Sequence, residues 1–93
     1  MKILIVEDDE NILSFLKRGF QEEDYIIDSA DDGEDGEYLA TSNSYDIIIL
    51  DWMLPNKSGI EILSSIREKN ITTPVIMLTA RGEIDDKVEG LTN

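Results

Sequence analysis

The sequence predicts an α/β fold in which a parallel β-sheet lies between layers of helices. Four short apolar runs alternate with four helix-like segments along the 93 residues. The runs are nearly continuous and rich in β-branched residues, which is typical of strands buried on both faces. Parallel strands of this kind are joined by right-handed crossovers. With 41% hydrophobic and 31% charged residues, we expect one globular domain spanning residues 1–93.

Two strand–helix pairs are expected in the first half of the chain. Residues 3–6 form the first strand, and the helix of residues 10–20 follows it. This helix places four apolar residues on one face: Ile12, Leu13, Leu16 and Phe20. Residues 25–27 form the second strand, and residues 34–40 form a weaker helix. Its only large apolar residues are Tyr38 and Leu39.

Two further pairs are expected in the second half. Residues 47–50 and 75–78 read as the third and fourth strands, with Pro55-Asn56 and Thr73-Pro74 as turns. The helix of residues 58–69 groups three apolar residues: Ile62, Leu63 and Ile66. A last helix is expected over residues 83–91, with its apolar residues spaced at i, i+4 and i+7: Ile84, Val88 and Leu91.

The charge and the missing residue types exclude several functions. The net charge is −13, and the 8 basic residues are scattered, so we expect no nucleic-acid binding. The absence of cysteine and histidine excludes disulfides, thiol chemistry, imidazole bases and ordinary zinc sites. The apolar part of the N-terminus is too short for a signal peptide, and no segment is long enough to span a membrane. We therefore expect a cytoplasmic chain with no membrane partner.

Acidic residues follow two of the expected strands at the point where each strand ends. Glu7, Asp8 and Asp9 come after the first strand, and Asp51 comes after the third. In parallel sheets the site lies beyond the carboxyl ends of the strands, where the strand order reverses. Carboxylates gathered there repel one another unless a cation joins them. Oxygen ligands that are few and rigidly placed suit Mg²⁺, so the sequence predicts a magnesium site.

Each of these acidic residues also has a purely structural interpretation. A single aspartate after an apolar run is usually a turn former or a helix cap, and we expect Asp9 to cap the helix that follows it. Trp52, Met53 and Leu54 are expected to pack, although the Met53 carbonyl could bind the metal. Gly33-x-x-Gly36 does not directly follow a strand and lacks a P-loop lysine, so it receives no phosphate role. Thr79 follows the fourth strand, where its hydroxyl could hydrogen-bond an oxyanion beside the metal.

Three segments give the sequence a close resemblance to the receiver domains of two-component response regulators. They are "ILIVEDDENI", "DIIILDWMLPNKSGIEIL" and "PVIMLTARGEIDDKVEGL". The resemblance covers the whole chain and is strongest to the OmpR/PhoB subfamily. It implies a flavodoxin-like parallel sheet with strand order 2-1-3-4, lacking the fifth strand and fifth helix with which the family continues. It therefore implies a C-terminally truncated receiver domain over residues 1–93.

The resemblance also implies the role of each site residue. Asp51 matches the phosphoacceptor, which takes its phosphoryl group from a sensor histidine kinase. Glu7 and Asp8, with Asp51 and the Met53 backbone carbonyl, match the Mg²⁺ ligands. Thr79 matches the switch hydroxyl that closes on the phosphoryl group. The chain is thus expected to be a phosphoacceptor and not an enzyme, from a parent protein that binds DNA and regulates transcription.

Three alternatives remain open at this point. A non-phosphorylated pseudo-receiver is credible because the lysine that the family carries after its fifth strand is not in this chain. A phosphatase of the haloacid-dehalogenase type needs a second acid where Met53 stands. A flavin-binding domain would need a hydroxyl-rich phosphate loop where Glu7, Asp8 and Asp9 stand. Self-association is also expected, through an exposed fourth strand or through the last helix.

Overall fold

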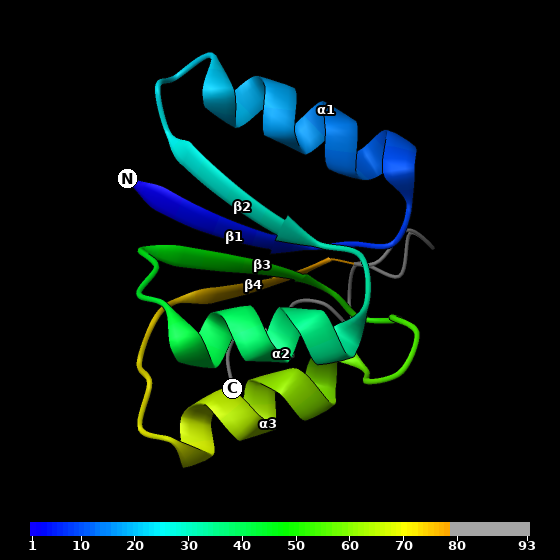
Figure 1. The fold of residues 1–93 in the computed structure, drawn as a ribbon, viewed down its shortest axis with the longest axis vertical. Helices are drawn as coiled ribbons and strands as arrows, with labels where there is room; N and C mark the ends of the chain where they lie inside the picture. Colours follow the sequence, from blue (N-terminus) through cyan, green and yellow to red (C-terminus); the bar gives the residue numbers. More distant parts are fainter. Residues whose placement is uncertain (79–93) are drawn as a thin grey trace.

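The computed structural model describes residues 1–78 of the chain, and within them a four-stranded parallel sheet carries three helices (Figure 1). The strand order is β2-β1-β3-β4, as predicted. The strands are β1 Lys2–Val6, β2 Ile26–Ala30, β3 Ile47–Asp51 and β4 Val75–Leu78. The helices are α1 Glu10–Gln21, α2 Gly33–Ser42 and α3 Gly59–Glu68. The helix and the Thr79 hydroxyl predicted after β4 lie outside the described residues.

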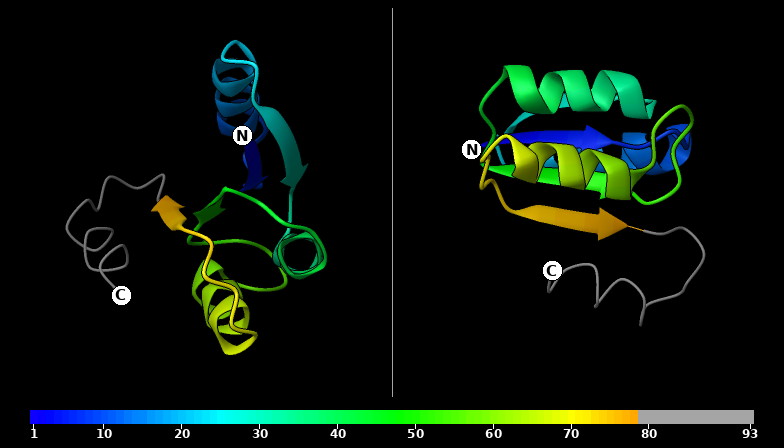
Figure 2. Two further views of the ribbon diagram at one scale, coloured as in Figure 1. Left: turned by 90° about the vertical axis from the view of Figure 1, so that its left-hand side faces the viewer. Right: turned by 90° about the horizontal axis from the view of Figure 1, so that it is seen from below.

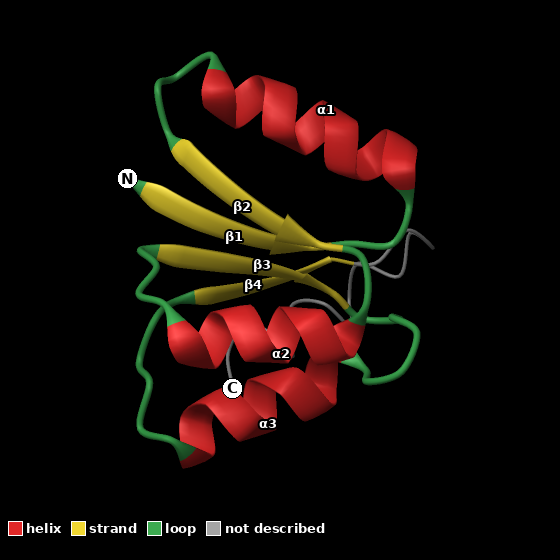
Figure 3. Cartoon of the chain, in the orientation of Figure 1, coloured by secondary structure: helices red, strands yellow, loops and turns green. Residues whose placement is uncertain are grey.

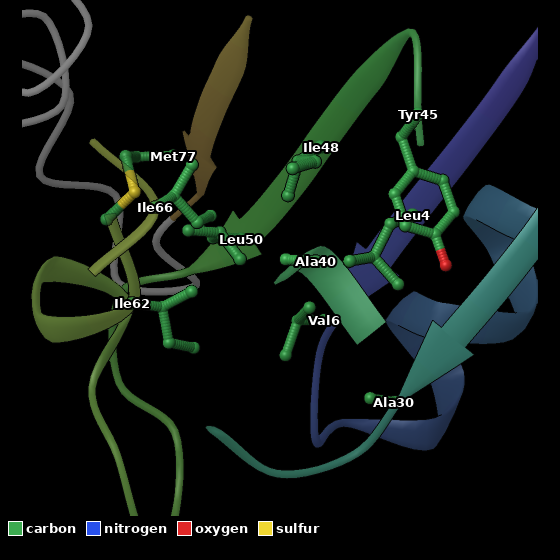
Figure 4. Close-up of a cluster of buried hydrophobic side chains, with 10 residues drawn as sticks. All are labelled: Leu4, Val6, Ala30, Ala40, Tyr45, Ile48, Leu50, Ile62, Ile66 and Met77. Carbon is green, nitrogen blue, oxygen red and sulfur yellow. The ribbon is translucent and has the colours of Figure 1, made fainter. Parts of the chain in front are cut away.

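The helices cover both faces of the sheet. Helix α1 lies on one face, and α2 and α3 lie side by side on the other (Figure 2). The core is therefore divided in two. The smaller part, under α1, is built on Ile3, Ile5 and Ile49. The larger part, under α2 and α3, is shown in Figure 4 and includes Leu4, Val6, Ile48, Leu50, Ile62, Ile66 and Met77. Alternate residues of β1 and β3 thus face opposite helical layers.

The register of the sheet fixes where the strands end. Val6 of β1 pairs with Leu50 of β3 and with Ala30 of β2. All four strands run the same way, so their carboxyl ends lie together at the same end of the sheet (Figure 3). From β1 the chain crosses to β2 on one side and later to β3 on the other, so the strand order reverses between β1 and β3. A site is therefore expected beyond the ends of these two strands.

Side-chain caps fix where the three described helices begin. Asp9 precedes α1, and its carboxylate accepts hydrogen bonds from the backbone N–H groups of Asn11 (2.9 Å) and Ile12 (3.1 Å). The predicted cap is therefore confirmed. Ser58 and Glu61 form a reciprocal capping box at the start of α3. No helix in residues 1–78 is both long and apolar enough to cross a membrane.

The second strand differs from its prediction. The sequence predicts it over residues 25–27, but it runs from Ile26 to Ala30 and so includes the polar residues Asp28 and Ser29. The parallel register with β1 continues through these polar residues because β2 is an edge strand and is covered less completely. Asp28 also has a partner there, since its carboxylate accepts a hydrogen bond from the Tyr45 hydroxyl at 2.7 Å.

Small residues explain why the sequence of α2 gives only a weak helical pattern. Of its two large apolar residues, Leu39 packs against the larger core, whereas Tyr38 is 69% exposed. The buried residues of α2 are small: Gly33, Gly36 and Ala40. Gly36 lies directly on β1, where an added Cβ would be only 2.6 Å from Val6 Cγ1. The helix packs closely through these small residues, which leave no periodic pattern of large apolar residues in the sequence.

Candidate functional site

The predicted acidic residues meet at the carboxyl ends of the strands. Glu7 follows the last residue of β1, and Asp51 is the last residue of β3. Because Val6 and Leu50 are paired, Glu7 and Asp51 stand side by side one position further along. Asp8 joins them, and one carboxylate oxygen from each of the three residues lies within 4.8 Å of the others. Glu7, Asp8 and Asp51 are called the acidic site below.

Two of these three carboxyl groups are buried. Glu7 is 2% exposed and Asp51 is 7% exposed, whereas Asp8 is open to solvent. Glu7 Oε2 accepts a hydrogen bond from the Asp9 backbone N–H at 3.1 Å. Asp51 Oδ1 accepts a longer one from the Met53 N–H at 3.4 Å. These backbone donors hold the two carboxyl groups in place while leaving oxygen lone pairs free for a ligand.

Burial and crowding perturb both buried groups. Burial raises the pKa of Glu7 from 4.5 to about 7, and the nearby Asp51 and Asp8 add to the rise. Burial also raises the pKa of Asp51 above its ordinary value. The two groups are neighbours, so the pair retains a proton to a higher pH than isolated carboxyl groups do. That proton relieves the repulsion between the two groups, and a bound cation would relieve it without a proton.

The residues present fit a hard divalent cation. The donor set contains only oxygen atoms, it is anionic, and rigid strand ends carry two of its members. These properties match the preferences of Mg²⁺, which usually retains several water ligands. Met53 lies beside Asp51, as its N–H bond shows, and the use of its carbonyl as a ligand remains a prediction.

The residues after Asp51 were only partly predicted. Trp52 and Leu54 pack against the larger core, as expected, but the Met53 side chain is 56% exposed. Gly59 begins α3 and is buried against the Asp51 carbonyl, with which an added Cβ would clash. The start of α3 therefore packs directly against the backbone of Asp51.

A second acidic group was not singled out from the sequence. Asp31, Asp32 and Asp35 also bring carboxylate oxygens within 4.8 Å of one another. None of the three is buried, and Asp32 caps α2 by accepting from the Asp35 N–H at 2.8 Å. A groove of about 490 Å³ beside them is lined by Asp31 and Asp35 but not by the acidic site. Capping explains Asp32, and all three carboxylates are open to solvent at least in part, whereas neither explanation applies to the two buried acids of the acidic site.

Comparison with known proteins agrees with this geometry. Residues 3–93 match the family described as "Response regulator receiver domain". The chain is 49% identical over 90 residues to the response regulator ArlR of Staphylococcus saprophyticus. It is 47% identical over 91 residues to the transcriptional regulatory protein HprR of Escherichia coli K12. These alignments cover 97% and 98% of this chain but only 40% of each relative.

Solved structures give the same result. The receiver domain of the Francisella response regulator 1452 superposes with a TM-score of 0.88 at 41% identity, covering 98% of this chain and 75% of that one. The response regulator TrrA of Thermotoga maritima, solved in complex with Mg²⁺ and BeF, has a TM-score of 0.84 at 38% identity. That match covers 96% of this chain and 77% of the other. Sequence and structure thus converge on one family.

Proposed function

The chain belongs to the response regulator receiver domain family, and from that premise we propose that it accepts a phosphoryl group on Asp51 with Mg²⁺ bound at the acidic site. The observation that carries the proposal is the position of Asp51. Asp51 is 7% exposed and ends a central strand, and its carboxylate has an oxygen within 4.8 Å of oxygens of Glu7 and Asp8. A buried aspartate beside two further acids is costly for the fold, and a role in binding a cation and a phosphoryl group accounts for that cost.

The chemistry requires little covalent assistance from the protein. An Asp51 carboxylate oxygen attacks the phosphorus atom of a phosphohistidine, so that a P–O bond forms as the P–N bond breaks. The electron pair of the broken bond stays on the histidine nitrogen. The main tasks are alignment and neutralisation of charge. The rigid end of β3 aligns Asp51, and a Mg²⁺ held by the acidic site would offset the negative charge of the carboxylates and of the phosphoryl group.

The partners follow from the family and its named relatives. Receiver domains accept their phosphoryl group from sensor histidine kinases, and we propose such a kinase as the donor here. HprR is named a transcriptional regulatory protein, which supports a parent protein of the OmpR/PhoB type that binds DNA. The chain spans 40% of the length of such relatives, so this output is assigned to the parent protein. Thr79 as the switch hydroxyl and the cytoplasmic location remain predictions.

A second copy of the chain is the further partner that we propose. Among the described strands, β4 has a neighbour on one side only, and Ile76 in it is 40% exposed. An apolar strand edge of this kind can pair with another strand. The expected self-association would use this edge or the segment after it.

The experiment that tests phosphoacceptor function is intact-mass measurement after incubation with a small acyl phosphate and Mg²⁺. A single phosphoryl adduct is expected, and a chelator should abolish it. Asp51→Asn should remove the adduct, because an amide oxygen is too weak a nucleophile for the reaction. Asp31→Asn, in the exposed acidic group, is the matched control and should leave the adduct unchanged. If the chain forms no adduct, or if Asp51→Asn forms one equally well, Asp51 is not the phosphoacceptor.

A further inference from the structure

The loop between β3 and α3 connects the acidic site to helix α2. This loop runs from Trp52 to Ser58 and brings Met53 beside Asp51. Its first residue is fixed by two backbone hydrogen bonds: the Trp52 N–H donates to the Leu78 carbonyl (2.9 Å), and the Trp52 carbonyl accepts from the Gly59 N–H (3.0 Å). The residues between Trp52 and Ser58 lie beyond the sheet, so other contacts must hold them.

The far half of the loop rests on the beginning of α2, as Figure 1 shows. The Gly33 N–H donates to the Pro55 carbonyl at 2.9 Å, and the Lys57 N–H donates to the same oxygen at 2.8 Å. Asn56 takes a left-handed backbone conformation (φ 71°) to close this turn. A Cβ on Gly33 would clash with the Lys57 carbonyl group, so the two backbones are in direct contact.

A charged pair adds a side-chain contact at the same place. Lys57 Nζ donates to Glu37 Oε1 at 2.9 Å, and the two side chains are 31% and 22% exposed. Glu37 lies four residues after Gly33 and therefore one turn along the same side of α2. The Lys57 ammonium lowers the pKa of Glu37, and Glu37 raises that of Lys57. The pair is thus a charge-assisted hydrogen bond between a loop and a helix that are far apart in the sequence.

We propose that Lys57 is a positioning residue for the metal: its bond to Glu37 holds the β3–α3 loop against α2 and so keeps the backbone of Met53 beside Asp51. The proposal rests on the proposed function, because it concerns Mg²⁺ binding at the acidic site. Lys57 itself binds neither metal nor phosphoryl group. The segment from Met53 to Lys57 is short, so fixing it at Lys57 restricts the positions that the Met53 backbone can take.

The sign of the effect distinguishes positioning from simple charge. Lys57 is a cation on the loop that follows Asp51. If only long-range charge mattered, replacing it by a neutral residue would strengthen binding of another cation. If Lys57 positions the loop, the same replacement weakens Mg²⁺ binding, since the loop must then be ordered when the metal binds.

The test is a Mg²⁺ titration of the chain followed by the fluorescence of Trp52, which is its only tryptophan. Lys57→Met retains the length of the side chain and removes its charge. We expect it to raise the Mg²⁺ dissociation constant about three-fold, within the range that a partly exposed ion pair allows. Quenching of Trp52 by acrylamide without metal should increase in the same variant, because the loop is less restrained.

Further variants separate this role from a general effect on folding. Glu37→Gln should raise the dissociation constant by a similar factor, and the double variant should do so no further, because both changes break one bond. The exchanged pair Lys57→Glu with Glu37→Lys should restore the affinity. Lys17→Met, on α1, removes the same charge elsewhere and should not weaken binding. Urea unfolding of each variant identifies any loss of stability.

The outcomes are distinct. Unchanged or tighter Mg²⁺ binding in Lys57→Met overturns the positioning role, even if that variant is less stable to urea. Equal weakening by Lys17→Met also overturns it. If the unsubstituted chain does not bind Mg²⁺, the metal assignment of the proposed function is wrong, and the positioning role is wrong with it.

Discussion

Glu7 illustrates how the site costs stability when no cation is present. Its pKa is raised from 4.5 to about 7, mainly by burial. The folded chain therefore binds this proton more tightly than the unfolded chain does. Stability from this group is fully present below pH 4.5 and is lost as the pH rises toward 7. At alkaline pH the fold must hold an ionised carboxylate in a buried place beside Asp51.

Replacing Glu7 by glutamine should remove this pH dependence. The amide oxygen of Glu7→Gln can still accept from the Asp9 N–H, while the charge is gone. The free energy of unfolding of Glu7→Gln, relative to that of the unsubstituted chain, should increase by up to about 3 kcal/mol between about pH 5 and about pH 8. Urea unfolding at several pH values measures the difference between the two proteins.

Comparison with a control identifies Glu7 as the cause. Glu23→Gln changes an exposed carboxylate, and its stability should depend on pH in parallel with that of the unsubstituted chain. Mg²⁺ should stabilise the unsubstituted chain at high pH more than it stabilises Glu7→Gln, because the variant loses a ligand. If the stability of Glu7→Gln and that of the unsubstituted chain depend on pH in parallel, Glu7 is not the group whose pKa is raised.

At this scale the sequence identified the acidic site but not all of its surroundings. Glu7, Asp8 and Asp51 could be predicted because each stands at the end of an apolar run, and strand ends meet at one edge of a parallel sheet. The Lys57–Glu37 bond could not be predicted, since it joins a turn to a helix without any sequence period between them. Which acids are buried also depends on tertiary packing, and no local pattern states it.

At the scale of elements, the close packing of α2 on the sheet is the feature that could not be predicted from the sequence. The strands were found because β-branched runs are a strong signal, and α1 and α3 were found because their apolar residues are periodic. Helix α2 gives only a weak signal, because it packs through glycine and alanine. The second strand was placed too early because its polar second half resembles a turn in isolation.

Two glycine substitutions should have opposite effects on stability. In Gly36→Ala the new Cβ would lie 2.6 Å and 2.9 Å from the two Cγ atoms of Val6, which is fully buried and has little room to move. We expect a loss of about 1–3 kcal/mol, as in other overpacked cores. Gly19→Ala adds a Cβ within α1 with nothing inside 4 Å. It should stabilise the chain by up to about 1 kcal/mol, because alanine favours the helix.

Urea denaturation of the two variants measures both effects. Each variant replaces one helical glycine by alanine, so the gain in helix propensity is the same and the difference reports contact with β1. Equal changes in the two midpoints would contradict the close packing of α2 on Val6.

At the scale of the whole molecule, we expect the edge that β4 forms among the described strands to control self-association. The mass from sedimentation at tens of micromolar should exceed the 10.5 kDa of one chain. Ile76→Lys should lower it, because a charge on β4 opposes pairing with a second strand. Ile26→Lys places the same charge on β2, the strand at the opposite edge, and is the matched control. If the unsubstituted chain sediments as a monomer, this prediction is wrong.

The placement of the acidic site also has a consequence for folding kinetics. Glu7 and Asp51 are distant in the sequence and meet only after β1 has paired with β3, across an intervening strand and two helices. Contacts of this kind form late, because closing a long loop costs entropy before any contact compensates it. A cation that needs both residues cannot assist the early steps. Mg²⁺ should therefore leave the refolding rate almost unchanged and act by slowing unfolding, so that the bound metal prolongs the lifetime of the native state.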